Sequence, residues 1–198
     1  MGANEPTVTD IRSAEEALAL FDRLPAARVA EITTGRWRGE ELHTGHSLDG
    51  VLGASGWYGK QFDGPDSVHP LLFTAGGAVF PVDPRRVPLA LAGRVPLSGV
   101  RAMRKMLPIL RPALRTHAPT ARLREVEYRG VTSAGMIYDH LPIIDHFRRA
   151  DEHTLLGVMD LRGLAEPYFF VLRRETRLRS PRNRTTVADP GPAPPAPH

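Results

Sequence analysis

The sequence predicts an α+β protein in which a mostly antiparallel β-sheet curls around an apolar interior and one or two helices cover it. Five apolar segments after residue 119 are joined by short connections, which favour antiparallel pairing of neighbouring strands. Residues 154–161 and 168–172 are apolar on both faces, whereas a strand with one solvated face alternates. Both surfaces must therefore be covered, most simply by a closed interior on one side and helices on the outside or across its mouth.

Three segments are predicted to be helical. Residues 13–24 begin with the capping-box spacing of Ser13 and Glu16, and a short helix fits residues 48–54 within a glycine-rich stretch. Residues 98–114 form a basic amphipathic helix that we expect to be kinked or broken at Pro108. Its apolar line contains Val100, Met103, Leu107, Leu110 and Leu114, and its cations are Arg101, Arg104, Lys105, Arg111 and Arg115.

The predicted strands fall into two groups within a single domain, residues 10–178. The first strand is expected at residues 29–38, and a meander of short strands follows at residues 71–74, 78–82 and 87–91. The later strands are expected at residues 122–131, 133–139, 143–149, 154–161 and 168–175. Residues 179–198 are rich in proline and arginine and cannot bury enough apolar surface to fold, so we expect a disordered tail.

Charge and composition exclude several functions. The 198 residues have a net charge of +4, and residues 173–198 carry six arginines against Glu175 and Asp189. The rest of the chain is therefore balanced, and we expect no nucleic-acid partner. The absence of cysteine excludes disulfides, thiolate nucleophiles and cysteine-bound metals.

Location and membrane contact follow from the hydropathy of the chain. The first residues lack the basic and apolar regions of a signal peptide, and we expect a cytoplasmic protein. No apolar run approaches the length of a membrane span, so lipid contact is expected to be peripheral or with single lipid molecules. The basic helix at residues 98–114 has two interpretations: a surface helix packed on the sheet, or a lid that meets an anionic membrane.

Several motifs resemble a bacterial family known as GXWXG proteins, which joins a GXWXG segment to a C-terminal domain of unknown function. The first segment covers about residues 28–92 and the second about residues 120–176. The motifs are Gly35-Arg36-Trp37-Arg38-Gly39, Gly56-Trp57-Tyr58-Gly59-Lys60, Val126-Glu127-Tyr128-Arg129-Gly130-Val131, Met136-Ile137-Tyr138-Asp139 and Gly157-Val158-Met159-Asp160-Leu161-Arg162-Gly163. The family name implies no activity.

The Gly-x-Trp motif is also similar to that of the calycin superfamily, which comprises lipocalins, fatty-acid-binding proteins and nitrobindins. This resemblance implies a calycin-like β-barrel that holds a hydrophobic ligand. It places Trp37, between Gly35 and Gly39, at the closed end of the barrel, against Arg173 or Arg174 from the last strand.

From these features we expect binding of a hydrophobic or amphipathic small molecule, a fatty acid or a phospholipid, in the barrel cavity. Burial of the acyl chain would supply most of the affinity. The sequence does not determine which face of each strand points inward, and it does not give the oligomeric state. The candidate ligand-binding residues are Trp57, Tyr58, Met136, Tyr138, Asp139, Ile144, His146, Leu156, Val158 and Phe169.

Two other functions stay open at this point. A haem-binding module similar to nitrobindin would use His146 or His153 as its ligand; otherwise no cofactor is required. A small hydrolase or isomerase would use Asp139, Asp145 and His146, because a histidine oriented by a carboxylate can transfer protons near neutral pH. We expect no metal, since His43 and His46 lie in a glycine-containing loop without further ligands.

Overall fold

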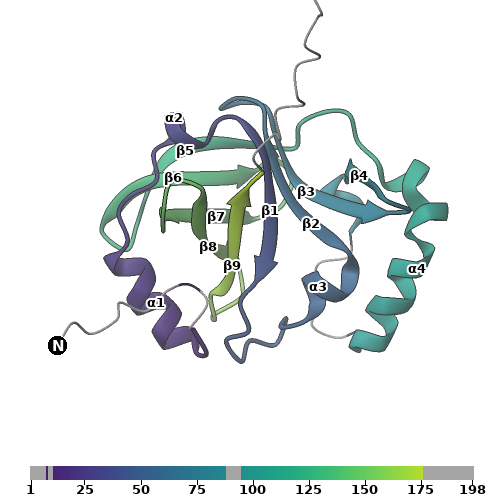
Figure 1. Cartoon of the computed structure of the whole chain (residues 1–198), viewed down its shortest axis with the longest axis horizontal. Helices are drawn as coiled ribbons and strands as arrows, with labels where there is room; N and C mark the ends of the chain where they lie inside the picture. The colour runs from purple at the N-terminus through teal and green to yellow at the C-terminus, as the bar shows by residue number, and fades with distance from the viewer. Residues whose placement is uncertain (1–7, 9–10, 88–94, 176–198) are drawn as a thin grey trace, which may run out of the picture.

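The fold is an antiparallel sheet that closes into a ring, seen in a computed structural model that describes residue 8 and residues 11–87 and 95–175 (Figure 1). Nine strands lie within these residues. They are β1 (Gly35–Glu41), β2 (Trp57–Phe62), β3 (Val68–Ala75), β4 (Ala78–Pro81), β5 (Ala121–Tyr128), β6 (Val131–Tyr138), β7 (Ile143–Arg149), β8 (Thr154–Leu161) and β9 (Tyr168–Arg174).

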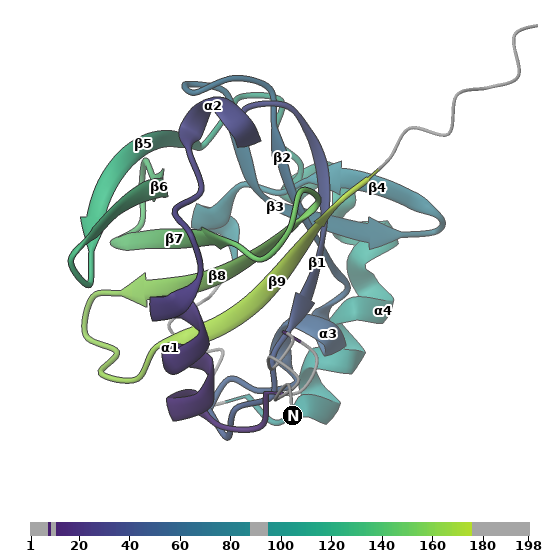
Figure 2. The same cartoon turned by 60° about the vertical axis from the view of Figure 1, so that its left-hand side comes forward.

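The strand order is β2-β1-β9-β8-β7-β6-β5-β3-β4, and an additional pairing between β2 and β3 closes the ring. All pairs are antiparallel, and β3 meets β5 through a single pair, Val68 with Ala121. Strand β4 pairs with the second half of β3 and extends the sheet beyond the ring. Figure 2 shows β5, β6, β7 and β8 on one side of the ring and β4 on the other.

Two long helices lie on opposite sides of the ring (Figure 1). Helix α1 (Ala14–Arg23) is capped by Ser13, whose Oγ accepts a hydrogen bond from the Glu16 backbone N–H at 3.2 Å. Helix α4 (Leu97–Leu114) lies beside β3, β4 and the short helix α3 (Val51–Ser55). The remaining short elements are α2 (Val29–Ile32) and a 3₁₀ turn, η1 (Pro84–Arg86).

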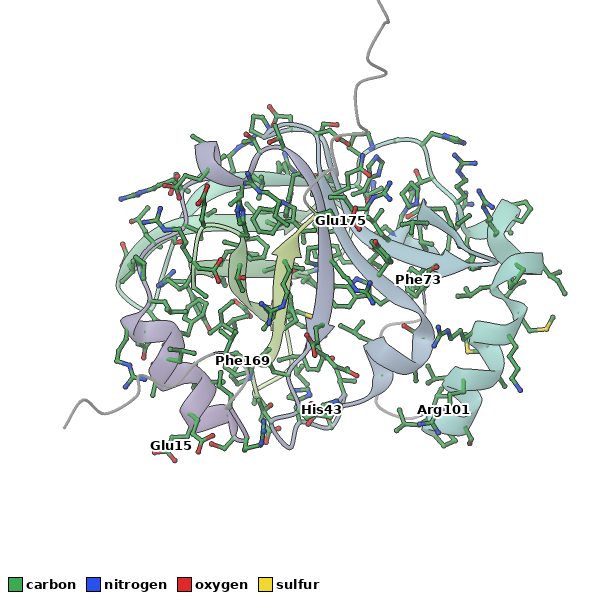
Figure 3. All side chains as sticks on the ribbon, viewed as in Figure 1. Glu15, His43, Phe73, Arg101, Phe169 and Glu175 are labelled. Carbon is green, nitrogen blue, oxygen red and sulfur yellow. The ribbon has the colours of Figure 1, made fainter. Side chains whose placement is uncertain are left out.

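Two apolar cores lie on the two faces of the sheet. The interior of the ring contains large buried side chains from nearly every strand, among them Trp37, Trp57, Phe62, Phe147 and Phe170. The outer core lies between α1 and strands β8 and β9. Figure 3 labels one residue of each core: Phe73, from the first core, lies on the side of α4, and Phe169, from the outer core, lies on the side of α1. Strands β8 and β9 are therefore apolar on both faces because the ring interior covers one face and α1 covers the other.

Most predicted elements are present, including α1, α3 and the five strands after residue 119. The first strand is corrected, because residues 29–32 are helical and β1 starts at Gly35. Glu31 explains the helical turn, since its carboxylate accepts the Arg28 backbone N–H at 3.0 Å. Of the predicted strand at residues 87–91, all but the first residue lies outside the described residues, as does the predicted tail from residue 179.

Helix α4 is continuous through Pro108, so of the two expectations there, a kink or a break, the break is wrong. Both Pro108 and Pro112 lie within the helix and are exposed. Proline lacks the N–H that would donate to the carbonyl four residues earlier, but on an exposed helix face water can satisfy that oxygen. The prediction of an amphipathic helix over residues 98–114 is confirmed to within one residue.

Candidate functional site

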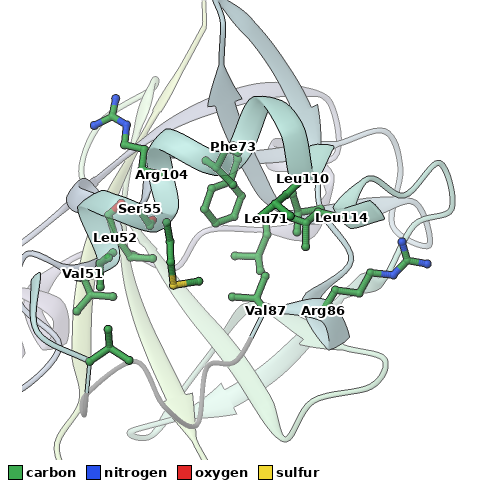
Figure 4. Close-up of a pocket in the computed structure, with 15 residues that line it drawn as sticks. Val51, Leu52, Ser55, Leu71, Phe73, Arg86, Val87, Arg104, Leu110 and Leu114 are labelled. Carbon is green, nitrogen blue, oxygen red and sulfur yellow. Dashed lines mark hydrogen bonds between the residues drawn. The ribbon is translucent and has the colours of Figure 1, made fainter. Parts of the chain in front are cut away.

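An apolar pocket lies between α4, α3 and β3, and its volume is about 240 Å³ (Figure 4). Aliphatic side chains and Phe73 form nearly all of its wall. The lining residues are Val51, Leu52, Ser55, Leu71, Phe73, Val82, Arg86, Val87, Val95, Val100, Met103, Arg104, Leu107, Leu110 and Leu114.

The pocket exists because α4 rests on the sheet through a narrow contact. Only Val100 and Leu107 of its 18 residues are buried. Backbone hydrogen bonds hold the C-terminal end of the helix against β4: the Asp83 N–H donates to the Leu114 carbonyl at 3.0 Å, and the Thr116 N–H donates to the Pro81 carbonyl at 3.1 Å. A helix anchored at its end and along one line leaves apolar space beside that line.

Three polar side chains reach the pocket wall, and two of them are already engaged. Ser55 Oγ donates to the Leu52 carbonyl at 2.7 Å. Arg86 donates to the Ala113 carbonyl and lies 3.7 Å from Asp83. Arg104 forms no ion pair with any residue that the structure describes. Figure 4 shows Arg104 at the rim of the pocket, with its guanidinium directed away from the cavity. The pocket therefore combines an apolar wall with one unpaired arginine at its rim, a combination suited to a molecule with an apolar tail and an anionic head.

The ring interior holds a buried ion pair. Lys60 Nζ donates to Asp145 Oδ2 at 2.8 Å and to the Pro70 carbonyl at 3.3 Å, and both charged side chains are at most 3 % exposed. Aromatic rings surround the ammonium group, with the Phe170 centroid at 4.8 Å and the Trp57 centroid at 5.7 Å. The pair is thus enclosed by side chains, and we assign it a structural role.

The pKa shifts of Asp145 and of its neighbour Tyr138 agree with an ion pair that is enclosed by protein. Burial raises the pKa of Asp145, and the Lys60 ammonium opposes this rise. Burial and the neighbouring Asp145 charge raise the pKa of Tyr138 well above its ordinary value, so that the phenol stays neutral. Lys60 and Asp145 lie 85 residues apart in the sequence, and no local pattern signals their contact.

Within the GXWXG motif, residues 35–39, Trp37 lies beside the last strand, and the Arg174 guanidinium carbon lies 4.6 Å from the centroid of its ring. Arg173, the other candidate partner, instead donates to Thr154 Oγ1 at 3.4 Å. Gly39, the second glycine of the motif, leaves room for Trp57, because a Cβ on Gly39 would lie 2.1 Å from the Trp57 ring. Gly35 has a φ of +96° and open space beside it, so backbone conformation is the requirement there.

The ten candidate ligand-binding residues separate into three groups, and none of them lines the pocket. Trp57, Met136 and Tyr138 lie in the ring interior. Tyr58 and Asp139 contact Glu175 and Arg122, respectively, away from that interior. The third group lies on the face opposite the interior and consists of Ile144, His146, Leu156, Val158 and Phe169. The last three pack beneath α1, because alternation along a strand sends neighbours to opposite faces.

The proposed acid–base set is not assembled, which corrects that alternative. Asp145 faces the interior and pairs with Lys60, whereas Asp139 pairs with Arg122 at 3.2 Å. His146 lies on the outer face, stacked on Tyr128 with ring centroids 3.9 Å apart. His153, the other candidate haem ligand, is exposed in the turn before β8.

The unfolding free energy should fall as the pH drops from about 6.5 to 4, because burial lowers the pKa of His146 to about 4. The unfolded chain then binds a proton that the folded chain excludes, at a cost of roughly 2–3 kcal/mol once both pKa values are passed. Denaturant titrations at several pH values measure this slope. In His146→Phe, which keeps a ring against Tyr128, the slope should be smaller, with a remainder from His69, whose pKa burial also lowers. An unchanged slope would contradict the assignment.

The sequence predicts one wall of the pocket, the apolar line of α4, but not the strand that faces it. The periodicity of the segment identifies the apolar line Val100, Leu107 and Leu114, but it does not state which strand the helix packs against.

Among the residues with described positions, no cluster of three or more histidine, aspartate or glutamate side chains could hold a metal ion. Within the same residues, no helix has both the length and the hydropathy needed to cross a membrane.

Comparisons with known proteins support the family resemblance. Residues 19–77 match the family described as GXWXG protein, and residues 119–174 match a domain of unknown function, DUF4334. A crystal structure of a protein from Thermomonospora curvata is 32% identical, with a TM-score of 0.62, and the alignment covers 84% of this chain and 90% of that one. No curated protein matches.

Proposed function

We propose that this chain, which belongs to the same family as the Thermomonospora curvata protein and carries the GXWXG and DUF4334 segments, binds a fatty acid or another single-chain amphiphile beneath α4. The observation that carries the proposal is the pocket itself: an apolar wall with the unpaired Arg104 at its edge. The proposed site therefore lies at the side of the ring, whereas the sequence predicts it in the interior.

The shape of the pocket favours one acyl chain. Its volume of about 240 Å³ lies just below the range of roughly 300–1,000 Å³ that is usual for small-molecule pockets. That volume suits a medium-length chain better than the two chains of a phospholipid. Each buried CH₂ would contribute about 0.8 kcal/mol, and Arg104 would favour a carboxylate over a neutral head.

The ring is also proposed to be a calycin-like barrel. Two observations support this assignment: the closure of the sheet through β2 and β3, and Trp37 of the first strand lying under Arg174 of the last. Departures from a simple barrel are β4 and α4, which extend beyond the ring, and α4 forms the pocket with α3 and β3. The proposed binding site thus belongs to the extension, and the barrel serves as its rigid support.

Affinity should rise with chain length along the series hexanoate, octanoate and decanoate. Each added CH₂ is expected to lower the Kd about fourfold until the pocket is full, because 0.8 kcal/mol corresponds to that factor. Decanol should bind more weakly than decanoate, and Arg104→Gln should reduce this difference. Isothermal titration calorimetry measures both effects.

Adjacent residues of α4 supply a matched pair of variants. Leu110 lines the pocket and Ile109 does not, although both are exposed, at 40 % and 70 %. Leu110→Asp should abolish decanoate binding, whereas Ile109→Asp, with the same change of charge on the same helix, should retain it. Equal losses in two folded variants, or no binding by the unmodified protein, would reject the proposal.

A further inference from the structure

Positive charge is concentrated in one segment of the chain. Residues 84–124 contain ten arginines and lysines and no acidic residue. Since the whole chain carries +4, this segment carries +10 and the rest carries −6. The charge of residues 1–172, which is balanced as a whole, is therefore the sum of a strongly positive region and a negative one.

Among the described residues, the cations of this segment that lack an ion pair lie on helix α4 or directly after it. The arginines on either side of the helix that the structure describes form ion pairs: Arg85 and Arg86 with Asp83, Arg122 with Asp139 and Arg124 with Asp66. The five cations on α4 or directly after it form none with described residues; they are Arg101, Arg104, Lys105, Arg111 and Arg115. An anionic partner can therefore reach them without displacing a carboxylate.

The same helix exposes apolar side chains on its other flank. Met103, Met106 and Ile109 are 48 %, 46 % and 70 % exposed, respectively. With 3.6 residues per turn, these side chains continue the apolar face around the helix from Leu110 to Ile109, and Arg101 and Lys105 lie on the other flank. The two flanks meet where Ile109 lies one turn after Lys105. The outer surface of α4 is thus divided into an apolar flank and a cationic flank.

From this surface we propose that α4 docks this protein on an anionic lipid membrane, with Met106 and Ile109 inserted at the boundary between headgroups and acyl chains. An interfacial helix needs an apolar flank for the lipid and lysine or arginine for anionic headgroups, and α4 supplies both. A nucleic acid would use the cations alone and leave the exposed methionines and isoleucine without a role. The membrane accounts for both flanks.

This inference goes beyond ligand binding and does not depend on it. Met106, Ile109, Arg101 and Lys105 do not line the pocket. Variants at these positions should therefore keep their affinity for decanoate in solution. A failure of docking and a failure of the pocket proposal are consequently observed separately.

Co-sedimentation with vesicles tests the proposal. The protein should bind vesicles of equal parts phosphatidylserine and phosphatidylcholine, should bind phosphatidylcholine alone far more weakly, and should lose affinity as salt is added. Arg101→Glu with Lys105→Glu should weaken binding at least about 25-fold, since each basic residue near an anionic surface contributes about fivefold. Arg23→Glu with Arg162→Glu changes the net charge equally at exposed positions off the helix and should have a much smaller effect.

The neutral variant Met106→Ser with Ile109→Ser distinguishes the partners. It should weaken vesicle binding at least about tenfold, because less apolar surface enters the lipid. The melting temperature and decanoate affinity of this variant should match those of the unmodified protein. Three results would overturn the proposal: no binding to the anionic vesicles, equal weakening by the Arg23 and Arg162 control, or salt-dependent binding of DNA in place of vesicles that the neutral variant leaves unchanged.

Discussion

Replacing Asp145 by alanine should lower the free energy of unfolding by about 3–5 kcal/mol. The Lys60 ammonium lies 2.8 Å from the Asp145 carboxylate, and both are almost fully buried. Removal of the carboxylate leaves a positive charge enclosed by aromatic rings, and the Pro70 carbonyl is then its one hydrogen-bond acceptor among the residues that the structure describes. Chemical denaturation measures the loss.

The double variant Lys60→Met with Asp145→Leu is the control for this prediction. It removes both charges, and with them the cost of burying either one, so it should be more stable than Asp145→Ala. A double variant whose loss equals the two single losses added together would show that the two residues do not act as a pair.

Replacing Trp37 by alanine should also cost about 3–5 kcal/mol, because a fully buried indole leaves a large cavity. For a chain of this size, the melting temperature should fall by roughly 10 °C or more. Trp37 packs edge-on against Phe62, with ring centroids 6.3 Å apart, and lies beneath Arg174, so neither neighbour can fill the space without leaving its own contacts.

Arg174 allows the cation–π part of this effect to be separated. Arg174→Gln should cost about 0.5–2 kcal/mol, and less than that in a background that already carries Trp37→Ala. Arg173→Gln, one residue earlier and facing away from the indole, serves as the matched control. A Trp37→Ala variant that melts within a degree or two of the unmodified protein would contradict the structural role of the motif.

The predictable part of this fold is local. Apolar segments and the turn residues between them define β7 and β8 to the residue, and the capping pair Ser13 and Glu16 defines the start of α1. At residues 29–32, by contrast, a β-branched apolar pattern predicted a strand, but hydrogen bonding by Glu31 and Glu125 to the backbone gives a helical turn.

The site depends on contacts that no local pattern contains. Leu156, Val158 and Phe169 are as apolar as the interior residues, and only the packing of α1 shows that they face outward. Likewise, the pocket arises where α4 meets a strand that ends more than 20 residues earlier in the chain, at Leu71 and Phe73. Sequence periodicity identified the apolar face of α4 without identifying its neighbour.

Methyl-selective NMR of the protein with decanoate tests the central claim most directly, because it locates the bound chain. Nuclear Overhauser contacts are predicted between the alkyl chain and the methyl groups of Leu71, Val100 and Leu107, which line the pocket beneath α4. Contacts with Leu155 and Leu172 in the ring interior, or with Leu156 and Val158 beneath α1, would place the ligand elsewhere and contradict the account.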